Sequence, residues 1–144
     1  MFNNINIIPI IIAAVVYMIL GSIWYSRYVF GTYWMKLTGW LPESSEDKVA
    51  RKKIANRAMI LNGVVALVLA FVIERVIYYS VPVVTLTNTL LVSGLLWLGF
   101  TAATNTAEYI YSTKPKKWLV FLINQGFLLL AILAMTFVLL FLRI

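Results

Sequence analysis

Four long runs of hydrophobic residues alternate with shorter polar stretches along this chain. The runs cover about residues 5–25, 54–79, 87–111 and 118–142. A helix rises about 1.5 Å per residue, so each run is long enough to cross the roughly 30 Å hydrocarbon core of a bilayer. The pattern predicts an all-α, polytopic membrane protein whose four transmembrane helices form two helical hairpins. Because no long polar stretch remains for a soluble domain, residues 1–144 should form a single transmembrane domain.

In the one long connection, residues 26–53, the first half is too short to span a membrane. This half mixes aromatic side chains with Arg27 and Lys36, which is typical of a segment lying at the lipid headgroups. A plain loop with interfacial aromatic residues is the alternative. In the second half, Ser44 followed by Asp47 three residues later matches a helix-capping box. We expect that helix to continue without a break into the second span.

The composition supports a membrane protein and limits the kinds of catalytic or metal site that the chain can form. Hydrophobic residues make up 62% of the chain and charged residues only 12%, too few to cover a water-soluble surface. Cysteine and histidine are absent, which excludes disulfides and thiolate nucleophiles and removes the commonest general base and metal ligand. The sequence also contains no phosphate-binding glycine loop, nucleophile elbow or acidic metal cluster. We therefore expect neither an enzyme nor a metal or cofactor site.

Basic residues are distributed unevenly between the connections. Ten of the 12 lie beside the first or third connection, and only Arg75 and Arg143 lie on the other side. By the positive-inside rule, the basic connections should face the cytoplasm and both termini should lie outside the cell membrane. The net charge of +7 then favours contact with the bilayer and its anionic headgroups, and not with nucleic acid. The expected headgroup contacts are Arg27, Lys36, Arg51, Lys52, Lys53, Trp34 and Trp40.

The third span has two distinct faces. Polar residues recur at helical spacing along one face, at Thr101, Thr104, Asn105, Glu108 and Ser112. Small residues recur along another, at Gly99, Ala103 and Ala107. Small residues at every fourth position let two helices approach closely. We therefore expect this span to be the central helix, with its small face packed and its polar face toward the bundle interior.

Glu108 is the most unusual of these side chains, because an ionisable residue within an apolar helix is energetically costly. It precedes Lys114 by six residues, which places it about 9 Å inside the membrane-spanning segment. Counting from other basic residues gives a similar depth for amide side chains in the second and fourth spans. The candidate layer for binding a ligand or ion consists of Glu108, Asn105, Asn62, Asn124, Gln125 and Thr101.

Three interpretations of this layer remain open. In the first, Glu108 binds or translocates a cation, a proton or a small molecule in a cavity reached from the cytoplasm, in a chain that forms a homo-oligomer. In the second, the layer is a purely structural hydrogen-bond cluster of an assembly protein, each bond contributing roughly 0.6–2 kcal/mol. In the third, Glu108 lies close enough to the boundary to meet water and pair with Lys114 or Lys116.

Glu74 and Arg75 lie near the opposite end of the second span. Adjacent residues do not face each other on a helix, so we do not expect these two to pair. We predict instead that their side chains reach the interface or pair with other helices.

Several short motifs resemble one known family. They read WYS at residues 24–26, FG at 30–31, Trp34, WLGF at 97–100, Asn105, FLIN at 121–124 and Gly126. Together they resemble a family of small four-helix integral membrane proteins that is catalogued only as a domain of unknown function. The resemblance implies four membrane spans, and it implies no activity, ligand or functional residue.

Overall fold

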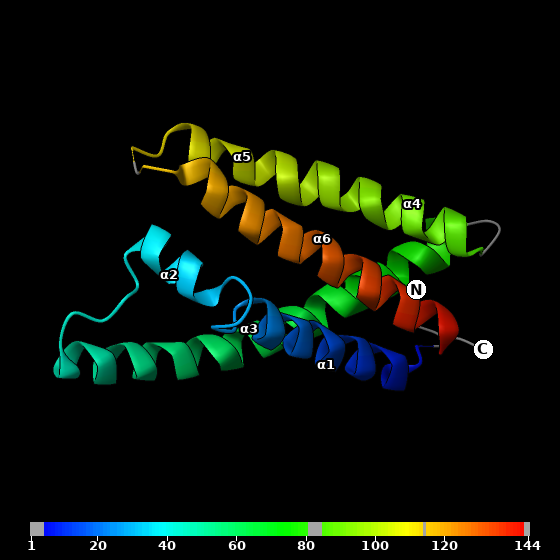
Figure 1. Ribbon diagram of the computed structural model, residues 1–144. Coiled ribbons are helices and arrows are strands. Elements are labelled where there is room, and N and C mark those ends of the chain that lie inside the picture. Colours follow the sequence, from blue (N-terminus) through cyan, green and yellow to red (C-terminus); the bar gives the residue numbers. More distant parts are fainter. Residues whose placement is uncertain (1–4, 81–84, 114, 143–144) are drawn as a thin grey trace.

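The computed structural model describes residues 5–80, 85–113 and 115–142. Its elements are α1 (Ile7–Trp24), α2 (Gly31–Thr38), α3 (Ser45–Ser80), α4 (Leu86–Leu96), the π-helical segment η1 (Trp97–Ala102), α5 (Ala103–Ile110) and α6 (Lys117–Phe141) (Figure 1). Within these ranges, the stretches long and apolar enough to cross a membrane are Ile7–Trp24, Ser45–Tyr79, Leu86–Ile110 and Lys117–Phe141. The prediction of an all-α protein with four spans is confirmed, and α3 runs unbroken from the predicted cap into the second span.

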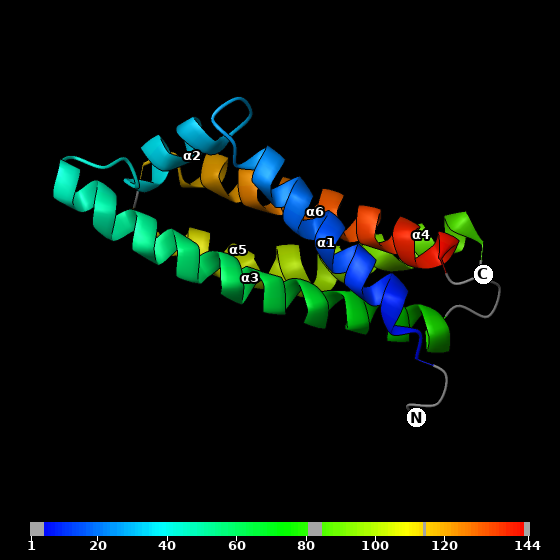
Figure 2. The same cartoon turned by 90° about the horizontal axis from the view of Figure 1, so that it is seen from below.

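The spans run back and forth, so their ends gather at two ends of the molecule. α2, the first turns of α3 and the junction of α5 with α6 lie at one end, which we call the basic end (Figures 1 and 2). Its described basic residues are Arg27, Lys36, Lys48, Arg51, Lys52, Lys53, Arg57, Lys116 and Lys117. The start of α1, the end of α3, the start of α4 and the end of α6 lie at the opposite end, which we call the far end.

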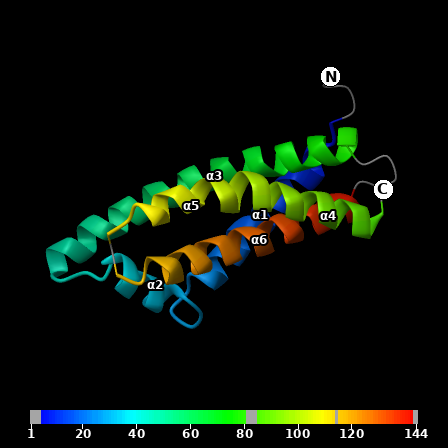
Figure 3. The same ribbon diagram turned by 90° about the horizontal axis from the view of Figure 1, so that it is seen from above.

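The central helix of the bundle is α6. It packs against α1, α2, α3, α4, η1 and α5, whereas the third span packs mainly on α6 and meets α3 through α4. Figure 3 shows the third span running along one side of α6. The prediction that the third span is central is therefore wrong. α6 takes this place because apolar residues surround most of its circumference, whereas a polar stripe occupies one side of the third span.

The small-residue face of the third span is not packed within the chain. Gly99, Ala103 and Ala107 are all exposed, and a Cβ added to Gly99 would meet nothing within 4 Å. The expected close approach of helices on this face does not occur inside one chain. Close packing is found instead in the far half of the bundle.

Small side chains line the core of the far half. Ala13, Ala66, Ala70, Ala131 and Met135 have no exposed surface and belong to one cluster. The alanines allow α1, α3 and α6 to approach closely. Dispersion contacts then supply the packing energy that helices in lipid cannot obtain from the hydrophobic effect.

Two pairs of polar side chains lie in the far half, although Arg75 Nη1 is buried without a partner among the described residues. Thr136 Oγ1 donates to Ser93 Oγ at 2.7 Å, and both residues are fully buried. Glu74 and Arg75 form an ion pair, in which Arg75 Nη2 donates to Glu74 Oε1 at 2.6 Å. The prediction that these neighbours would not pair is wrong. Both side chains are long enough to bend toward each other across the helix surface, and at 11–12% exposure neither has ready access to water as an alternative partner.

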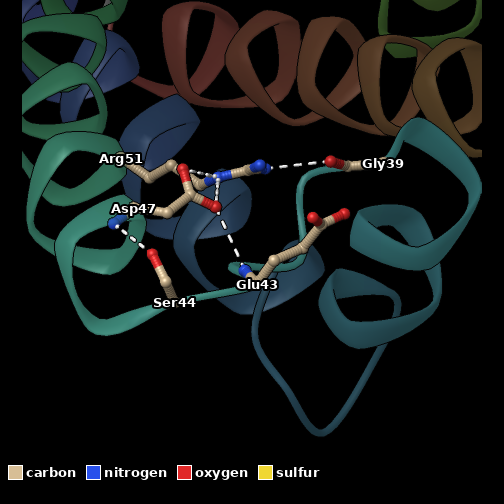
Figure 4. Close-up of polar contacts among 5 residues, drawn as sticks. All are labelled: Gly39, Glu43, Ser44, Asp47 and Arg51. Atoms are coloured by element: carbon tan, nitrogen blue, oxygen red, sulfur yellow. Dashed lines mark hydrogen bonds and ion pairs between the residues drawn. The ribbon is translucent and has the colours of Figure 1, made fainter.

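A corner at the basic end joins α2 to α3 (Figure 4). Ser44 Oγ accepts from the Asp47 N–H at 3.1 Å, which confirms the predicted cap, and the Asp47 carboxylate accepts from the Glu43 N–H at 3.1 Å. Arg51 Nε donates to Asp47 at 2.8 Å, and Arg51 Nη1 donates to the Gly39 carbonyl at 2.9 Å. Gly39 follows α2 in the left-handed conformation, with φ of 74°. Arg51 thus holds the end of α2 against α3, and its hydrogen bond lowers the pKa of the Asp47 carboxyl.

Candidate functional site

A tight turn after α1 directs α2 back over the basic end of the bundle. A Cβ added to Gly31 would lie 2.0 Å from the Tyr25 carbonyl oxygen, so the turn leaves no room for a side chain at this position. The Gly31 N–H donates to the Ser26 carbonyl at 2.8 Å and closes the turn. As a result, α2 presents Trp34 toward α6.

Asn124 on α6 joins three other elements through its side chain. Its Oδ1 accepts from Tyr25 Oη on α1 and from Trp34 Nε1 on α2, each at 3.0 Å. Its Nδ2 donates to Tyr109 Oη on α5 at 3.0 Å. We call these four residues the Asn124 hub. Both polar atoms of the amide are satisfied, so the hub fixes the positions of α1, α2 and α5 around α6.

Two tryptophans, one on α1 and one on η1, donate hydrogen bonds to backbone carbonyls in the same turn of α6. Trp24 Nε1 on α1 donates to the Ile123 carbonyl, and Trp97 Nε1 on η1 donates to the Gln125 carbonyl, both at 3.1 Å. Trp97 is the first residue of the π-helical segment. Such segments insert extra chain into a helix turn and rotate the faces on either side relative to each other. The indole contact thus anchors the start of the segment that orients α5.

A cavity of about 710 Å³ lies between α1, α2, α3, α5 and α6. Five of the six residues predicted for the polar layer line it, namely Asn62, Asn105, Glu108, Asn124 and Gln125. Thr101 is not among the lining residues. Aromatic and methionine side chains supply much of the remaining wall, including Tyr25, Trp34, Trp40, Tyr109, Phe127, Met18, Met35 and Met59.

Gln125 contains an unsatisfied oxygen near this cavity. The residue is 4% exposed and is among those that line the cavity, but its Oε1 is itself buried and has no hydrogen-bond partner among the described residues. A buried acceptor without a donor costs roughly 1–3 kcal/mol. Gln125 therefore differs from its neighbour Asn124, whose amide oxygen and nitrogen both have partners in the hub.

Glu108 is exposed toward the cavity and takes part in neither ion pair of the described residues, which are Asp47–Arg51 and Glu74–Arg75. Lys117 Nζ, at the nearby start of α6, donates to the carbonyls of Ile110 and Ser112 at 3.0 and 2.8 Å. Lys114, one of the two expected partners of Glu108, lies outside the described residues, so that interpretation stays a prediction.

A second cavity of about 280 Å³ adjoins the first on the side of the α5–α6 junction. Trp34, Glu108, Tyr109 and Asn124 line both cavities. The Asn124 hub therefore forms a partition between the two, and Glu108 borders each of them. The smaller cavity also includes Lys117, so it lies nearer to the charged surface of the basic end.

The family model described as "Protein of unknown function (DUF1761)" matches residues 8–140. The chain belongs to the DUF1761 family. The resemblance drawn from the short motifs is thereby confirmed. No curated protein and no solved structure matches this DUF1761 chain.

In this DUF1761 chain, some of the residues expected at lipid headgroups are exposed, whereas others contact the hub or the larger cavity. Arg27, Lys36, Lys52 and Lys53 are exposed, as headgroup contact requires. Trp34 belongs to the hub, and Trp40 lines the larger cavity with the Arg51 guanidinium 5.8 Å from its ring centre. Contact with headgroups stays a prediction for all seven residues.

The aromatic partners of Asn124 are residues of the candidate site that sequence reasoning missed. The sequence predicts headgroup contact for Trp34, because aromatic side chains near span ends have that role in general, and it assigns no partner to Tyr25 or Tyr109. A signal was available, since a buried tyrosine or tryptophan needs a partner for its polar atom. Nothing in the spacing, however, identified Asn124 as that partner.

Proposed function

We propose that this protein binds or translocates a small molecule or ion in the larger cavity, with Glu108 as the charged group of the site. The observation that carries the proposal is the Glu108 carboxylate, which lines the larger cavity and takes part in neither ion pair of the described residues. Among the described residues, no Lys or Arg lines this cavity, so Glu108 is the one charged side chain of the described lining. Its volume falls within the usual range for small-molecule sites, roughly 300–1,000 Å³.

The proposal includes a location and an orientation. The protein is a multi-pass protein of the cell membrane with the basic end in the cytoplasm, in line with the excess of Lys and Arg at that end. Because the chain lacks cysteine, single cysteines provide a direct test. Ser44→Cys should resist a membrane-impermeant thiol reagent added to intact cells, and Asn6→Cys should react. The reverse pattern would contradict the orientation.

Binding or transport fits the residues better than catalysis. The described lining of the cavity includes one carboxylate and no second acid that could share acid–base work. The chain also has no histidine or cysteine to act as a base or nucleophile. We therefore propose that the protein is not an enzyme. The proposal also includes a homo-oligomer, for which the unpacked face at Gly99, Ala103 and Ala107 is the available contact surface.

A structural or assembly role is the second candidate, and the Asn124 hub favours it. Three hydrogen bonds of 3.0 Å converge on one amide and connect four helices. In this view the whole polar layer fixes helix register. The two candidate functions differ in the role of Glu108, which has no part in the hub's hydrogen bonds.

The deciding experiment compares the wild type with Glu108→Gln in proteoliposomes. The influx of protons, Rb⁺ and a lipophilic cation is measured in each, together with the thermal stability of the protein in detergent. Glu46→Gln, an exposed carboxylate in the first turn of α3, is the matched control. Loss of a flux in Glu108→Gln alone, at unchanged melting temperature, supports a binding site. A lower melting temperature with no flux that depends on Glu108 supports the structural role and contradicts the proposed function.

A further inference from the structure

We infer that the ligand of the larger cavity is a lipophilic organic cation carrying one positive charge. The inference rests on the proposed function, because it names the chemical class that the Glu108 site would take. Three independent properties of the cavity lead to it: the kind of wall, the charge of the lining and the volume.

The wall is built from groups that attract organic cations. Four aromatic residues line the cavity from α2, from α5 and from the segments just after α1 and α2. They are Trp34, Tyr109, Tyr25 and Trp40. The face of an aromatic ring carries negative charge density, and a cation within about 6 Å of its centre is attracted by about 0.5–2 kcal/mol. The structure contains one instance at the rim, where the Arg51 guanidinium stands 5.8 Å from the ring centre of Trp40.

Methionines add an adaptable apolar surface to this wall. Met18, Met35 and Met59 line the cavity from α1, α2 and α3. Methionine side chains are flexible and polarisable, so they adjust to apolar groups of different shapes. A ligand for this wall should therefore carry a substantial apolar body in addition to its charge.

The charge of the lining sets the sign and the number of ligand charges. Among the described residues that line the larger cavity, Glu108 is the sole charged one. The polar lining also includes the amide residues Asn62, Asn105, Asn124 and Gln125. An anionic ligand would face repulsion from Glu108, with no basic residue in the described lining to offset it. A monocation neutralises the site.

The volume and the donor set argue against a bare metal ion as the principal ligand. A cavity of about 710 Å³ is far larger than one ion and its ligands require. Divalent cations also favour several carboxylates, and no group of three His, Cys, Asp or Glu residues occurs within the described part of the chain.

The position of the cavity fits a ligand that partitions into the bilayer. α3 and α5 diverge toward the basic end (Figure 1), and residues of both helices line the cavity. Met59 on α3 lines the cavity and is 55% exposed, so the opening is bordered by apolar surface. A ligand dissolved in the bilayer therefore meets apolar surface before it meets Glu108, which the sequence predicts to lie about 9 Å inside the membrane-spanning segment.

Tetraphenylphosphonium tests the inference, because it combines one delocalised positive charge with four aromatic rings. Its binding to the purified full chain in lipid nanodiscs is measured by equilibrium dialysis. Tetraphenylborate, of the same shape and opposite charge, is the ligand control, and Glu46→Gln is the protein control. We expect saturable binding of the cation to the wild type and to Glu46→Gln. For Glu108→Gln we expect the Kd to rise by about 10- to 100-fold, as loss of a charge partner in a partly desolvated site predicts.

Two further outcomes decide the matter. Equal binding by the wild type and Glu108→Gln, or saturable binding of tetraphenylborate, would show apolar partitioning alone and overturn the inference. Absence of cation binding together with a proton or Rb⁺ flux that depends on Glu108 would overturn the ligand class and leave the proposed function intact. Trp40→Leu, which removes a ring and keeps the charge, should weaken binding less than Glu108→Gln does and leave the melting temperature unchanged.

Discussion

The two halves of the bundle are packed differently. In the far half, α1, α3 and α6 meet through alanines, and Ala13, Ala66, Ala70 and Ala131 have no exposed surface. In the basic half, α3 and α5 diverge (Figure 1), and residues of both helices line a cavity of about 710 Å³. Polar side chains of the far half pair with one another, as in the contact of Thr136 with Ser93, although Arg75 Nη1 is buried without a partner among the described residues. In the basic half, Glu108 takes part in neither ion pair of the described residues.

The difference supports the proposal that the far half provides stability and the basic half provides a binding site. A helical bundle in lipid is held together by close packing and by satisfied hydrogen bonds. The far half has the closer packing, whereas the basic half combines an open cavity with the hydrogen bonds of the Asn124 hub. A cavity beside a well-packed half is what a ligand site on a rigid support requires.

The largest expected effect contrasts two methionines, one from each half. Met135→Ala removes a side chain with no exposed surface and should lower the free energy of unfolding by about 2–5 kcal/mol, because the cavity left behind loses dispersion contacts. Met59→Ala, at 55% exposure in the basic half, should change it far less. Unfolding in detergent, followed by circular dichroism, measures both. Similar losses for the two variants would remove the contrast between the halves.

An intermediate effect separates two asparagines of the polar layer. Asn124→Leu removes three hydrogen bonds and leaves Tyr25, Trp34 and Tyr109 without a partner, which should cost about 2 kcal/mol at the typical value per bond in membranes. Asn105→Leu alters a cavity residue outside the hub and should cost less. Melting temperatures of the two variants in the same detergent provide the measurement. A larger loss for Asn105→Leu would show that the cavity wall, and not the hub, holds the basic half together.

The smallest expected effect lies at the exposed corner of α2 and α3. Asp47→Asn removes the ion pair with Arg51 and should increase hydrogen exchange of α2 amides without changing the global melting temperature. Because the pKa of Asp47 is lower in the folded state, its stabilising contribution is complete above the unfolded-state pKa and is lost as the pH falls through the folded-state value. The wild type should therefore approach the exchange rate of Asp47→Asn under acidic conditions. A global destabilisation by Asp47→Asn would show that the corner belongs to the core of the fold.

Much of this fold is predictable because membrane spans depend on length and apolarity, which a sequence displays directly. The grouping of Glu108 with four of the five other candidate residues around one cavity also followed from the sequence, since rise per residue places them at similar levels along their helices. Thr101 was wrongly grouped with the cavity because its spacing from Glu108 assumed an unbroken α-helix. Thr101 lies in the π-helical segment, where the turn contains more residues and rotates its face away.

Other features could not be predicted from one sequence because they depend on how helices meet. The central position of α6 and the pairing of Trp34 with Asn124 require the crossing of elements that are far apart in the chain. Aromatic residues near a span end have the same pattern whether they face lipid or a polar partner. The Glu74–Arg75 pair arises from the bending of long side chains in a poorly hydrated setting, which spacing alone does not describe.

Gly31 shows how a residue without a side chain controls the shape of the cavity. A Cβ at this position would lie 2.0 Å from the Tyr25 carbonyl oxygen, so its absence lets the chain reverse and return α2 to the bundle. Any larger residue there would push α2 outward and carry Trp34 away from Asn124, although Gly31 takes no part in the hub's hydrogen bonds. Variants at this position should therefore lose the cavity while keeping the four spans inserted, so that a correctly targeted, membrane-embedded protein is produced that has no binding site.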